Sequence, residues 1–214
     1  YILKKKPKKV FCIEKDNQLI NFLKNKFRDE IILINDDILK VSENQISENK
    51  LTVFGNLPYN ISTQILLKWI LNLNSNLWFD ALVLMFQKEV AERIISKYNT
   101  SNYGRLSVIS NWKLNIKKII DVSPNSFKPK PKIESSVLLF TPKKEYPNLN
   151  SSKSLEKVTR IFFNQRRKKI RKSFNQLFKD SNFTAKKLGI DLNLRPQNLN
   201  FNDYFKIAKE LENS

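Results

Sequence analysis

Four short apolar runs most constrain the fold of this chain. They lie at residues 10–13, 31–34, 51–54 and 79–86. Runs of this length that lack strict alternation with polar residues are typical of strands buried on both faces of a sheet. Segments with the spacing of amphipathic helices follow at residues 16–27, 65–71 and 87–95, and Asp16 is expected to cap the first of them. This alternation predicts a parallel sheet with helices on its faces, the α/β class.

Polar residues follow the first three of these strands. Glu14, Asp37 and Asn56 each lie just beyond or at a strand end. Parallel topology places all three on one edge of the sheet, where open α/β sheets bind ligands. Taken singly, Glu14 is a solvated loop acid and Asp37 a turn or capping residue. Taken together, they predict a site in which carboxylates hold the ribose hydroxyls of an adenosine cofactor.

The loop at residues 56–59 combines an amide, a rigid turn and an aromatic ring. Asn56 both donates and accepts hydrogen bonds, Gly55 and Pro58 are expected to end the strand, and Tyr59 is able to stack on a base. Ser62 or Thr63 is expected to cap the helix that follows. Our hypothesis is that this loop holds an adenine amine beside a methyl donor.

The segment from Phe127 to Val137 is forced into an extended path by Pro129 and Pro131. Two interpretations remain open. The segment is either a stiff basic linker, or a loop that lays Phe127 against the substrate base and lysines against phosphates. Polar residues at 143–153 then mark the best domain boundary, which divides the chain into residues 1–146 and 147–214.

The part of the chain beyond this boundary has helical periodicity and a dense basic run. The basic residues are Arg166, Arg167, Lys168, Lys169, Arg171 and Lys172. One helix is expected to carry the run, with Ile170, Phe174 and Leu177 facing inward. Contact with RNA phosphates is favoured over a merely solvated face. Gly189 is expected to end one helix and Asn202 to cap the last.

Composition supports a polyanionic partner. The chain has 39 Lys and Arg against 20 Asp and Glu, a formal net charge of +19. Nucleic acid is favoured over membrane, although a drift toward Lys, Asn and Ile is an alternative explanation. Cys12 is the only cysteine and there is no His, so an internal disulfide and a Cys/His zinc site are excluded. No apolar run reaches the roughly 18 residues that a membrane span needs.

Several blocks of this sequence together resemble one family, the ribosomal RNA adenine N6-dimethyltransferases of the KsgA/RsmA type. The blocks are Phe11–Asp16, Asp36–Ile38, Asn56–Tyr59, Gln87–Arg93, Tyr103–Ser107, Phe127–Ser135, Phe163–Arg167 and Leu188–Asp191. A loop such as Asn56–Tyr59 alone is shared by many amino methyltransferases. The full series, in order along nearly the whole chain, is much more specific.

The resemblance implies a Rossmann-like S-adenosylmethionine-dependent methyltransferase domain, incomplete at its N-terminus, and a small all-α C-terminal domain that binds rRNA. It implies transfer of methyl groups to N6 of adenines in small-subunit (16S) rRNA, giving N6,N6-dimethyladenosine. The partner is then small-subunit rRNA in the pre-30S subunit, and the protein is a monomer with no membrane contact. The bacterial cytoplasm is the expected compartment, with an organelle matrix as the alternative.

The resemblance also assigns roles to the candidate residues. Catalytic roles fall to Asn56, Leu57, Pro58 and Tyr59, and contact with the substrate base to Tyr59 and Phe127. Cofactor binding falls to Glu14, Asp37, Ile38 and Asn56. The six basic residues between 166 and 172 are assigned to RNA.

The family's Gly-rich cofactor turn has no counterpart in this sequence and is expected upstream of Tyr1. Two other functions therefore remain open. One is a ribosome-assembly or rRNA-binding factor that keeps the fold without catalysis. The other is a 23S rRNA adenine methyltransferase, a relative that shares the first domain and a similar loop.

Overall fold

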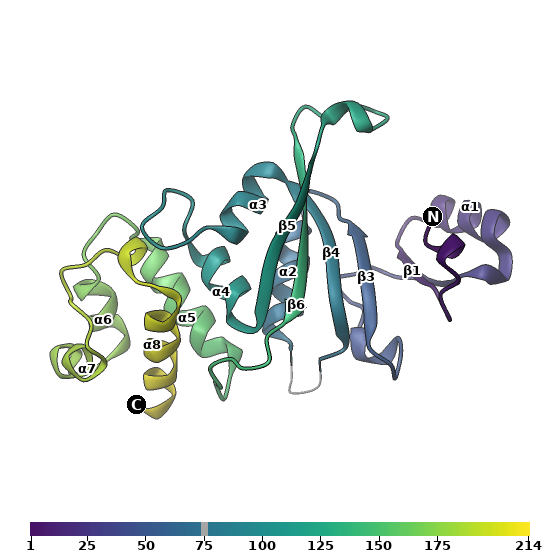
Figure 1. Cartoon of the computed structure of the whole chain (residues 1–214). Coiled ribbons are helices and arrows are strands. Elements are labelled where there is room, and N and C mark those ends of the chain that lie inside the picture. Colours follow the sequence, from purple (N-terminus) through teal and green to yellow (C-terminus); the bar gives the residue numbers. More distant parts are fainter. Residues whose placement is uncertain (74–76) are drawn as a thin grey trace. The chain divides into compact units, whose positions relative to one another are not determined.

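The computed structural model describes residues 1–73 and 77–214, which divide into two compact units, Tyr1–Lys50 and Leu51–Ser214 (Figure 1). The divide comes just before the strand that carries the Asn56–Tyr59 loop. The boundary expected near residue 147 lies inside the second unit and stays a prediction. No helix in the described ranges has the length and apolar character needed to cross a bilayer.

The first unit is a β-α-β segment with parallel strands. Its regular elements are β1 (Phe11–Glu14), α1 (Asn17–Phe27) and β2 (Ile32–Asn35), with short 3₁₀ turns at Leu3–Lys5, Arg28–Glu30 and Glu43–Gln45. Strand β1 pairs in parallel with β2, so that Glu14 lies opposite Asn35. Asp16 caps α1 as predicted, because its carboxylate accepts from the Gln18 amide at 2.7 Å and the Leu19 amide at 3.2 Å.

The sheet of the second unit is mixed. Its strands are β3 (Leu51–Asn56), β4 (Phe79–Gln87), β5 (Leu114–Val122) and β6 (Ser135–Pro142), in the spatial order β3-β4-β6-β5. Strands β3 and β4 are parallel as expected, but β6 is antiparallel to both β4 and β5. The parallel pairing expected for the four apolar runs is confirmed for β1 with β2 and for β3 with β4. The strands β5 and β6, which that alternation did not cover, add an antiparallel hairpin to the sheet.

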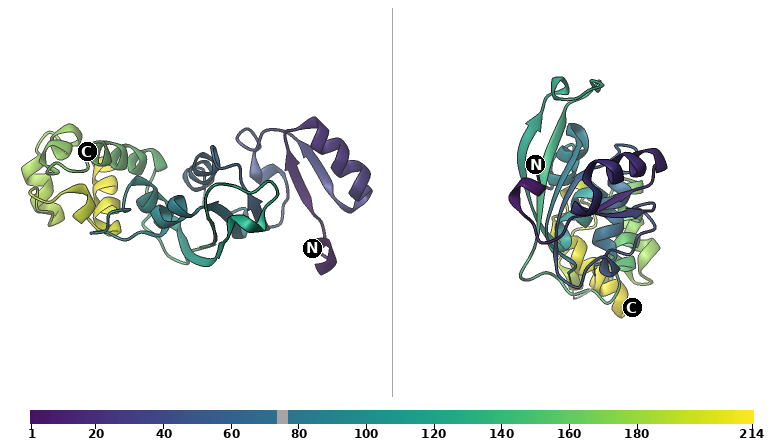
Figure 2. Two further views of the ribbon diagram at one scale, coloured as in Figure 1. Left: turned by 90° about the horizontal axis from the view of Figure 1, so that it is seen from above. Right: turned by 90° about the vertical axis from the view of Figure 1, so that its right-hand side faces the viewer.

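Three helices accompany the sheet: α2 (Ser62–Leu71), α3 (Lys88–Ile95) and α4 (Arg105–Lys113). The predicted cap of α2 is wrong. The capping position is Ile61, which makes no side-chain cap, and the Ser62 hydroxyl instead donates to the Tyr59 carbonyl at 3.2 Å. Figures 1 and 2 show the β5–β6 hairpin projecting beyond the rest of the sheet.

The remaining helices are α5 (Ser152–Asn164), α6 (Arg171–Leu177), α7 (Ser181–Leu188) and α8 (Phe201–Asn213). They do not form a separate core. Tyr103, Val108 and Trp112, in or just before α4, are buried in the same apolar cluster as Phe162 of α5 and Tyr204 of α8. The rings of Phe162 and Tyr204 meet edge to face with their centroids 5.7 Å apart, and the ring of Phe163 stacks on Tyr204 at 5.3 Å.

Two local expectations for this part are corrected and one is confirmed. The basic run is not one helix, because α5 ends at Asn164 and α6 begins only at Arg171. The chain turns there to bury Ile170 fully, and the Ile170 amide donates to the Leu194 carbonyl at 2.9 Å. Asn200, not Asn202, caps α8, in a reciprocal pair with Asp203. Gly189 ends α7 as predicted, at a φ of +68° that favours glycine.

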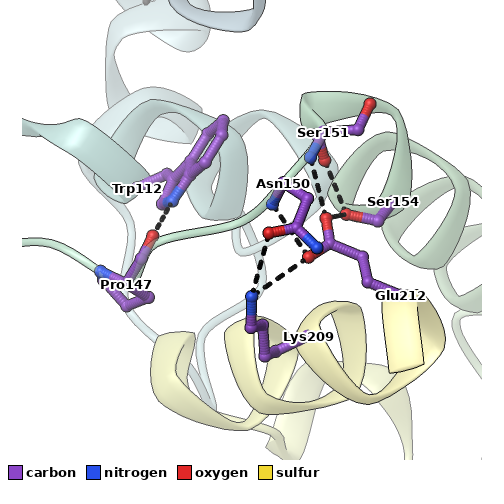
Figure 3. Close-up of polar contacts among 7 residues, drawn as sticks. All are labelled: Trp112, Pro147, Asn150, Ser151, Ser154, Lys209 and Glu212. Atoms are coloured by element: carbon purple, nitrogen blue, oxygen red, sulfur yellow. Dashed lines mark hydrogen bonds and ion pairs between the residues drawn. The ribbon is translucent and has the colours of Figure 1, made fainter. Parts of the chain in front are cut away.

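A buried carboxylate joins the start of α5 to the last helix (Figure 3). Glu212 accepts hydrogen bonds from the amides of Asn150 and Ser151, both at 2.9 Å, and from the Ser154 hydroxyl at 2.8 Å. Its side chain is 7% exposed, and Lys209 lies 3.5 Å away. Burial alone would raise the pKa of Glu212, but these hydrogen bonds and Lys209 outweigh it and hold the pKa below its ordinary value.

We expect Glu212→Gln to lower the free energy of unfolding by about 1.5–3 kcal/mol at pH 7, the usual range for hydrogen bonds to a charged group. The folded-state pKa lies below the unfolded value near 4.5, so this stabilisation is present above that pH and is lost as the pH falls through the folded-state pKa. Urea unfolding of both proteins between pH 3 and pH 7 measures it.

The matched control is Glu210→Gln on the same helix, since the Glu210 carboxylate makes an ion pair with Lys187 at 2.7 Å. Glu210→Gln should lower the free energy of unfolding by less than Glu212→Gln does. A Glu212→Gln deficit that stays constant from pH 7 to pH 3 would contradict the role given to the carboxylate.

Candidate functional site

The Asn56–Tyr59 loop begins at the carboxyl end of β3. Asn56 is the last residue of the strand, lies opposite Met85 of β4, and is exposed. Leu57 is buried at 9% exposure and folds back over Gly55. A Cβ at Gly55 would lie 2.9 Å from Cδ2 of Leu57 and 2.8 Å from Cδ2 of Leu84. The absence of a side chain at Gly55 therefore lets Leu57 pack against the sheet and fixes where the loop starts.

Hydrogen bonds hold the rest of the loop. The Pro58 carbonyl accepts from the Ile61 amide at 3.1 Å, and the Tyr59 carbonyl accepts from the Ser62 hydroxyl at 3.2 Å. The Tyr59 hydroxyl lies 2.6 Å from Oγ of Ser135, the first residue of β6. The Tyr59 ring is half-buried, while the side chain of Asn56 stays exposed. The loop thus presents an amide and one ring from a fixed backbone.

Sequence reasoning did not single out Ser135. The residue is fully buried and lies 76 positions from Tyr59, so no local spacing indicates their contact. The pairing of the strands brings them together, because Gln87 at the end of β4 lies opposite Ser135, which also lies opposite Val122 of β5. The loop, the start of α3 and the β5–β6 hairpin therefore all leave the sheet at the same end.

A hollow of about 300 Å³ lies at this end of the sheet. It is lined by Gln87, Lys88, Glu89, Glu92, Ile133 and Glu134. The Lys88 ammonium pairs with Glu134 at 2.6 Å, and this hydrogen bond raises the pKa of Lys88. The Lys88 amide also donates to the Glu134 carbonyl at 3.0 Å, so the base of the hairpin is fastened to α3.

Phe127 lies within the hairpin, at the end of the 3₁₀ turn Pro124–Ser126, and is half-buried. Its amide donates to the Pro124 carbonyl at 3.2 Å. Within the described residues its ring makes no contact with the ring of Tyr59. A joint role for the two rings on one base stays a prediction.

Glu14 and Asp37 come together in the first unit, at the carboxyl ends of β1 and β2. Oε1 of Glu14 accepts the amides of Lys15 and Asp16 at 2.7 and 2.9 Å, and within the described chain no hydrogen bond reaches Oε2. Asp37 accepts the Leu39 amide at 3.0 Å and pairs with the Lys15 ammonium at 2.9 Å. The Leu39 amide and then Lys15 hold the pKa of Asp37 below its ordinary value.

The contacts of Glu14 and Asp37 are compatible with binding of a nucleoside. Glu14 is held by one oxygen and offers the other as an acceptor, which suits a ribose hydroxyl. Asp37 is ionised and fixed in a turn, with half-buried Ile38 next to it. The structure thus brings Glu14, Asp37 and Ile38 together at one strand edge. Asn56, the fourth residue assigned to the cofactor, belongs to the second unit, and its share in cofactor binding stays a prediction.

The six basic residues between 166 and 172 are not equivalent. The Arg166 guanidinium donates to the Thr100 carbonyl at 3.2 Å and also to the Ser101 carbonyl, so it holds the loop between α3 and α4. Lys169 donates to Asn193 at 3.1 Å and Arg171 to Asn182 at 3.0 Å. Arg167, Lys168 and Lys172 are exposed, and their side chains make no hydrogen bond or ion pair within the described ranges. Of the six, these three are the most available to a phosphate.

Comparisons with known proteins agree with this arrangement. The family model for ribosomal RNA adenine dimethylase matches residues 1–213. The chain is 66% identical over 212 residues to the ribosomal RNA small subunit methyltransferase A of Pelagibacter ubique, covering 99% of this chain and 81% of that protein. Identity to the protein of the same name from Ehrlichia ruminantium is 39% over 212 residues, covering 97% and 79%.

Two solved structures share the fold. A dimethyladenosine transferase from Plasmodium falciparum superposes with a TM-score of 0.80 at 24% identity, covering 96% of this chain and 82% of that one. The 23S rRNA methyltransferase ErmE superposes with a TM-score of 0.66 at 19% identity, with the same coverage. Both support a Rossmann-like methyltransferase fold with a helical C-terminal part. From the match over residues 1–213 and the identity to the Pelagibacter protein, this chain belongs to the ribosomal RNA adenine dimethylase family.

Proposed function

We propose that this chain transfers methyl groups from S-adenosylmethionine to N6 of adenines in small-subunit rRNA, giving N6,N6-dimethyladenosine. The names of its relatives support the reaction and the substrate. The structural observation that carries the proposal is the Asn56–Tyr59 loop, which is fixed to the sheet while the Asn56 amide stays exposed.

The loop is suited to a poor nucleophile. The lone pair of an adenine N6 is delocalised into the ring, so the amine reacts only when its geometry is made more tetrahedral. Oδ1 of Asn56 and a neighbouring backbone carbonyl would accept the two N6 hydrogens and turn the lone pair toward the methyl group. The second acceptor is the carbonyl of Leu57 or of Pro58, and the Pro58 carbonyl has one lone pair left after it accepts from the Ile61 amide.

Tyr59 would stack on the adenine, which must leave its helix or loop to reach the site. Stacking of a base on an aromatic side chain contributes about 1–3 kcal/mol. The N6 nitrogen becomes positively charged as it bonds to the methyl carbon, and it then gives a proton to water. No side chain therefore has to act as a strong base, and the absence of His from the chain is no obstacle. Positioning of the amine supplies most of the acceleration.

When bound, S-adenosylmethionine supplies an electrophilic methyl group on its sulfonium. Oε2 of Glu14 would accept a ribose hydroxyl, and the Asp37–Ile38 turn would contact the adenine of the cofactor. The hydrogen bonds from the amides of Lys15 and Asp16 keep the Glu14 carboxylate oriented for this contact. Lys15 does the same for Asp37 by its ion pair.

The proposed partner is small-subunit rRNA within a pre-30S particle, bound by a monomer. The net charge of +19 and the exposed group Arg167, Lys168 and Lys172 support an RNA partner. The bacterial cytoplasm is the proposed compartment, since the relatives named above are bacterial rRNA methyltransferases. A 23S rRNA substrate is the alternative, and mapping the methylated adenines in each rRNA distinguishes the two.

We expect Asn56→Ala to lower the rate of methyl transfer to pre-30S particles by at least about 100-fold, as the loss of one preorganised polar contact does in other enzymes. Mass spectrometry of N6,N6-dimethyladenosine in digested rRNA measures the rate, and calorimetry measures cofactor affinity, which should change less. Asn60→Ala is the matched control, because Asn60 is an exposed amide in the same loop. Equal rates for the two variants would refute the role of Asn56.

Replacement of Arg167, Lys168 and Lys172 by Gln should weaken RNA binding and reduce the salt dependence. The plot of log affinity against log salt has a negative slope, and each lost phosphate contact reduces the magnitude of that slope by about one. A control that replaces Lys4, Lys5 and Lys8 by Gln removes the same charge from exposed positions in the first unit. Fluorescence anisotropy at several salt concentrations measures both. If the two triple variants have the same slope, total charge and not this group governs binding.

Arg166→Gln provides a contrasting case. Its guanidinium is engaged by the Thr100 and Ser101 carbonyls, so this change should lower thermal stability while altering the salt slope less than Arg167→Gln does. Differential scanning fluorimetry and the same anisotropy titration measure the two effects. A larger change in slope for Arg166→Gln would show that Arg166 contacts phosphate.

A further inference from the structure

We propose that Ser135 is a positioning residue for methyl transfer, because its buried hydroxyl fixes the Tyr59 phenol and thereby sets the plane of the ring on which the target adenine stacks. This inference rests on the proposed function, since it gives Tyr59 the task of stacking. It adds a residue that touches neither the base nor the cofactor.

Ser135 is a rigid point of attachment. It is the first residue of β6, it is fully buried, and it lies opposite Gln87 of β4 on one side and Val122 of β5 on the other. A residue with a paired strand on each side has little freedom of backbone movement. The position of its Oγ is therefore set by the sheet.

Tyr59, by contrast, lies on a loop that has left the sheet. Its backbone is held by the Ser62 hydroxyl, which donates to the Tyr59 carbonyl, and by the turn in which the Pro58 carbonyl accepts from the Ile61 amide. These contacts fix where the ring starts and not where it points. The 2.6 Å contact between the Tyr59 hydroxyl and Oγ of Ser135 fixes the far end of the ring.

A ring held at both ends has a defined plane, and its half-buried state leaves surface for a base. The adenine N6 must meet the methyl group nearly in line, and Asn56 is only three residues away on the same backbone. A tilt of the ring would move the stacked adenine relative to the Asn56 amide. Misplacement of a reacting group by about 1 Å is able to cost about 100-fold in rate. The hydroxyl pair therefore acts on the chemical step more than on RNA affinity.

Ser136 supplies a matched comparison within the same strand. It too is fully buried, but successive side chains of a strand point to opposite faces, and its hydroxyl donates to Oδ1 of Asp121 at 2.5 Å. Asp121 is paired with Lys118 in β5, away from Tyr59. Replacing either serine by Ala removes one buried hydroxyl and one hydrogen bond from β6. Of the two hydroxyls, the one that contacts Tyr59 is that of Ser135.

The experiment compares Ser135→Ala, Tyr59→Phe, their double variant and Ser136→Ala in the full chain. We expect Ser135→Ala and Tyr59→Phe each to lower kcat for methylation of pre-30S particles about tenfold, with KM for the particle unchanged. The double variant should fall no further, because both changes remove the same hydrogen bond. Ser136→Ala should keep kcat within about twofold while its melting temperature changes as much as that of Ser135→Ala.

A second measurement needs no methyl transfer. The probe is a single-stranded oligoribonucleotide with one 2-aminopurine, whose fluorescence is quenched by stacking. Wild type and Ser136→Ala should quench it strongly, Ser135→Ala and Tyr59→Phe less, and Tyr59→Ala least. Equal quenching by wild type and Ser135→Ala, or no quenching by wild type, overturns the inference.

The two sets of results separate the inference from the proposed function. If wild type and the variants quench the probe in the expected order but wild type leaves rRNA unmodified, the proposed reaction fails and the positioning of Tyr59 by Ser135 stands. If wild type methylates rRNA and Ser135→Ala has the kcat of Ser136→Ala, the inference fails and the reaction stands. The inference is also overturned if the fold-loss of kcat in the double variant equals the product of the fold-losses in Ser135→Ala and Tyr59→Phe.

Discussion

The position of β4 between a parallel and an antiparallel neighbour is the constraint on which the candidate site depends. Leu82, Leu84 and Phe86 lie at alternate positions of this strand and are fully buried, so its register with β3 and β6 is strongly specified. A slip of one residue would turn this apolar set to the other face of the sheet. The register places Asn56 opposite Met85 and Ser135 opposite Gln87. The Asn56–Tyr59 loop and Ser135, which contacts it, therefore meet at one end of the sheet.

Side chains of one type serve different purposes in this chain, according to their surroundings. Arg166 and Arg167 are neighbours in a basic run, but one donates to the carbonyls of a loop and the other is exposed. Ser135 and Ser136 are both fully buried, but one contacts Tyr59 and the other Asp121. Composition predicts the kind of partner, and local geometry decides which of the residues are available to it.

Two charged side chains inside the second unit, Glu212 and Lys113, are hydrogen-bonded to polar atoms. Glu212 is ionised because backbone amides and a hydroxyl outweigh the cost of burial. Lys113 is 7% exposed and donates to the Leu73 carbonyl at 2.5 Å, with its ammonium 4.2 Å from the Trp112 ring centroid. Burial lowers the pKa of Lys113. Glu212 and Lys113 thus lie where amides, a carbonyl or a ring compensate for lost water.

The amino-acid sequence by itself determined the α/β class, the first four strands, the Asp16 and Gly189 helix ends and the strand-end location of Glu14, Asp37 and Asn56. These features are local, since apolar periodicity, capping chemistry and turn residues act within a few positions. Tertiary structure alone decided the antiparallel half of the sheet, the break in the basic run at Ile170, the engagement of Arg166 and the contact of Ser135 with Tyr59. Each joins residues far apart in the chain, and the physical reason is that burial and strand pairing select partners by position in space, which spacing along one sequence does not encode.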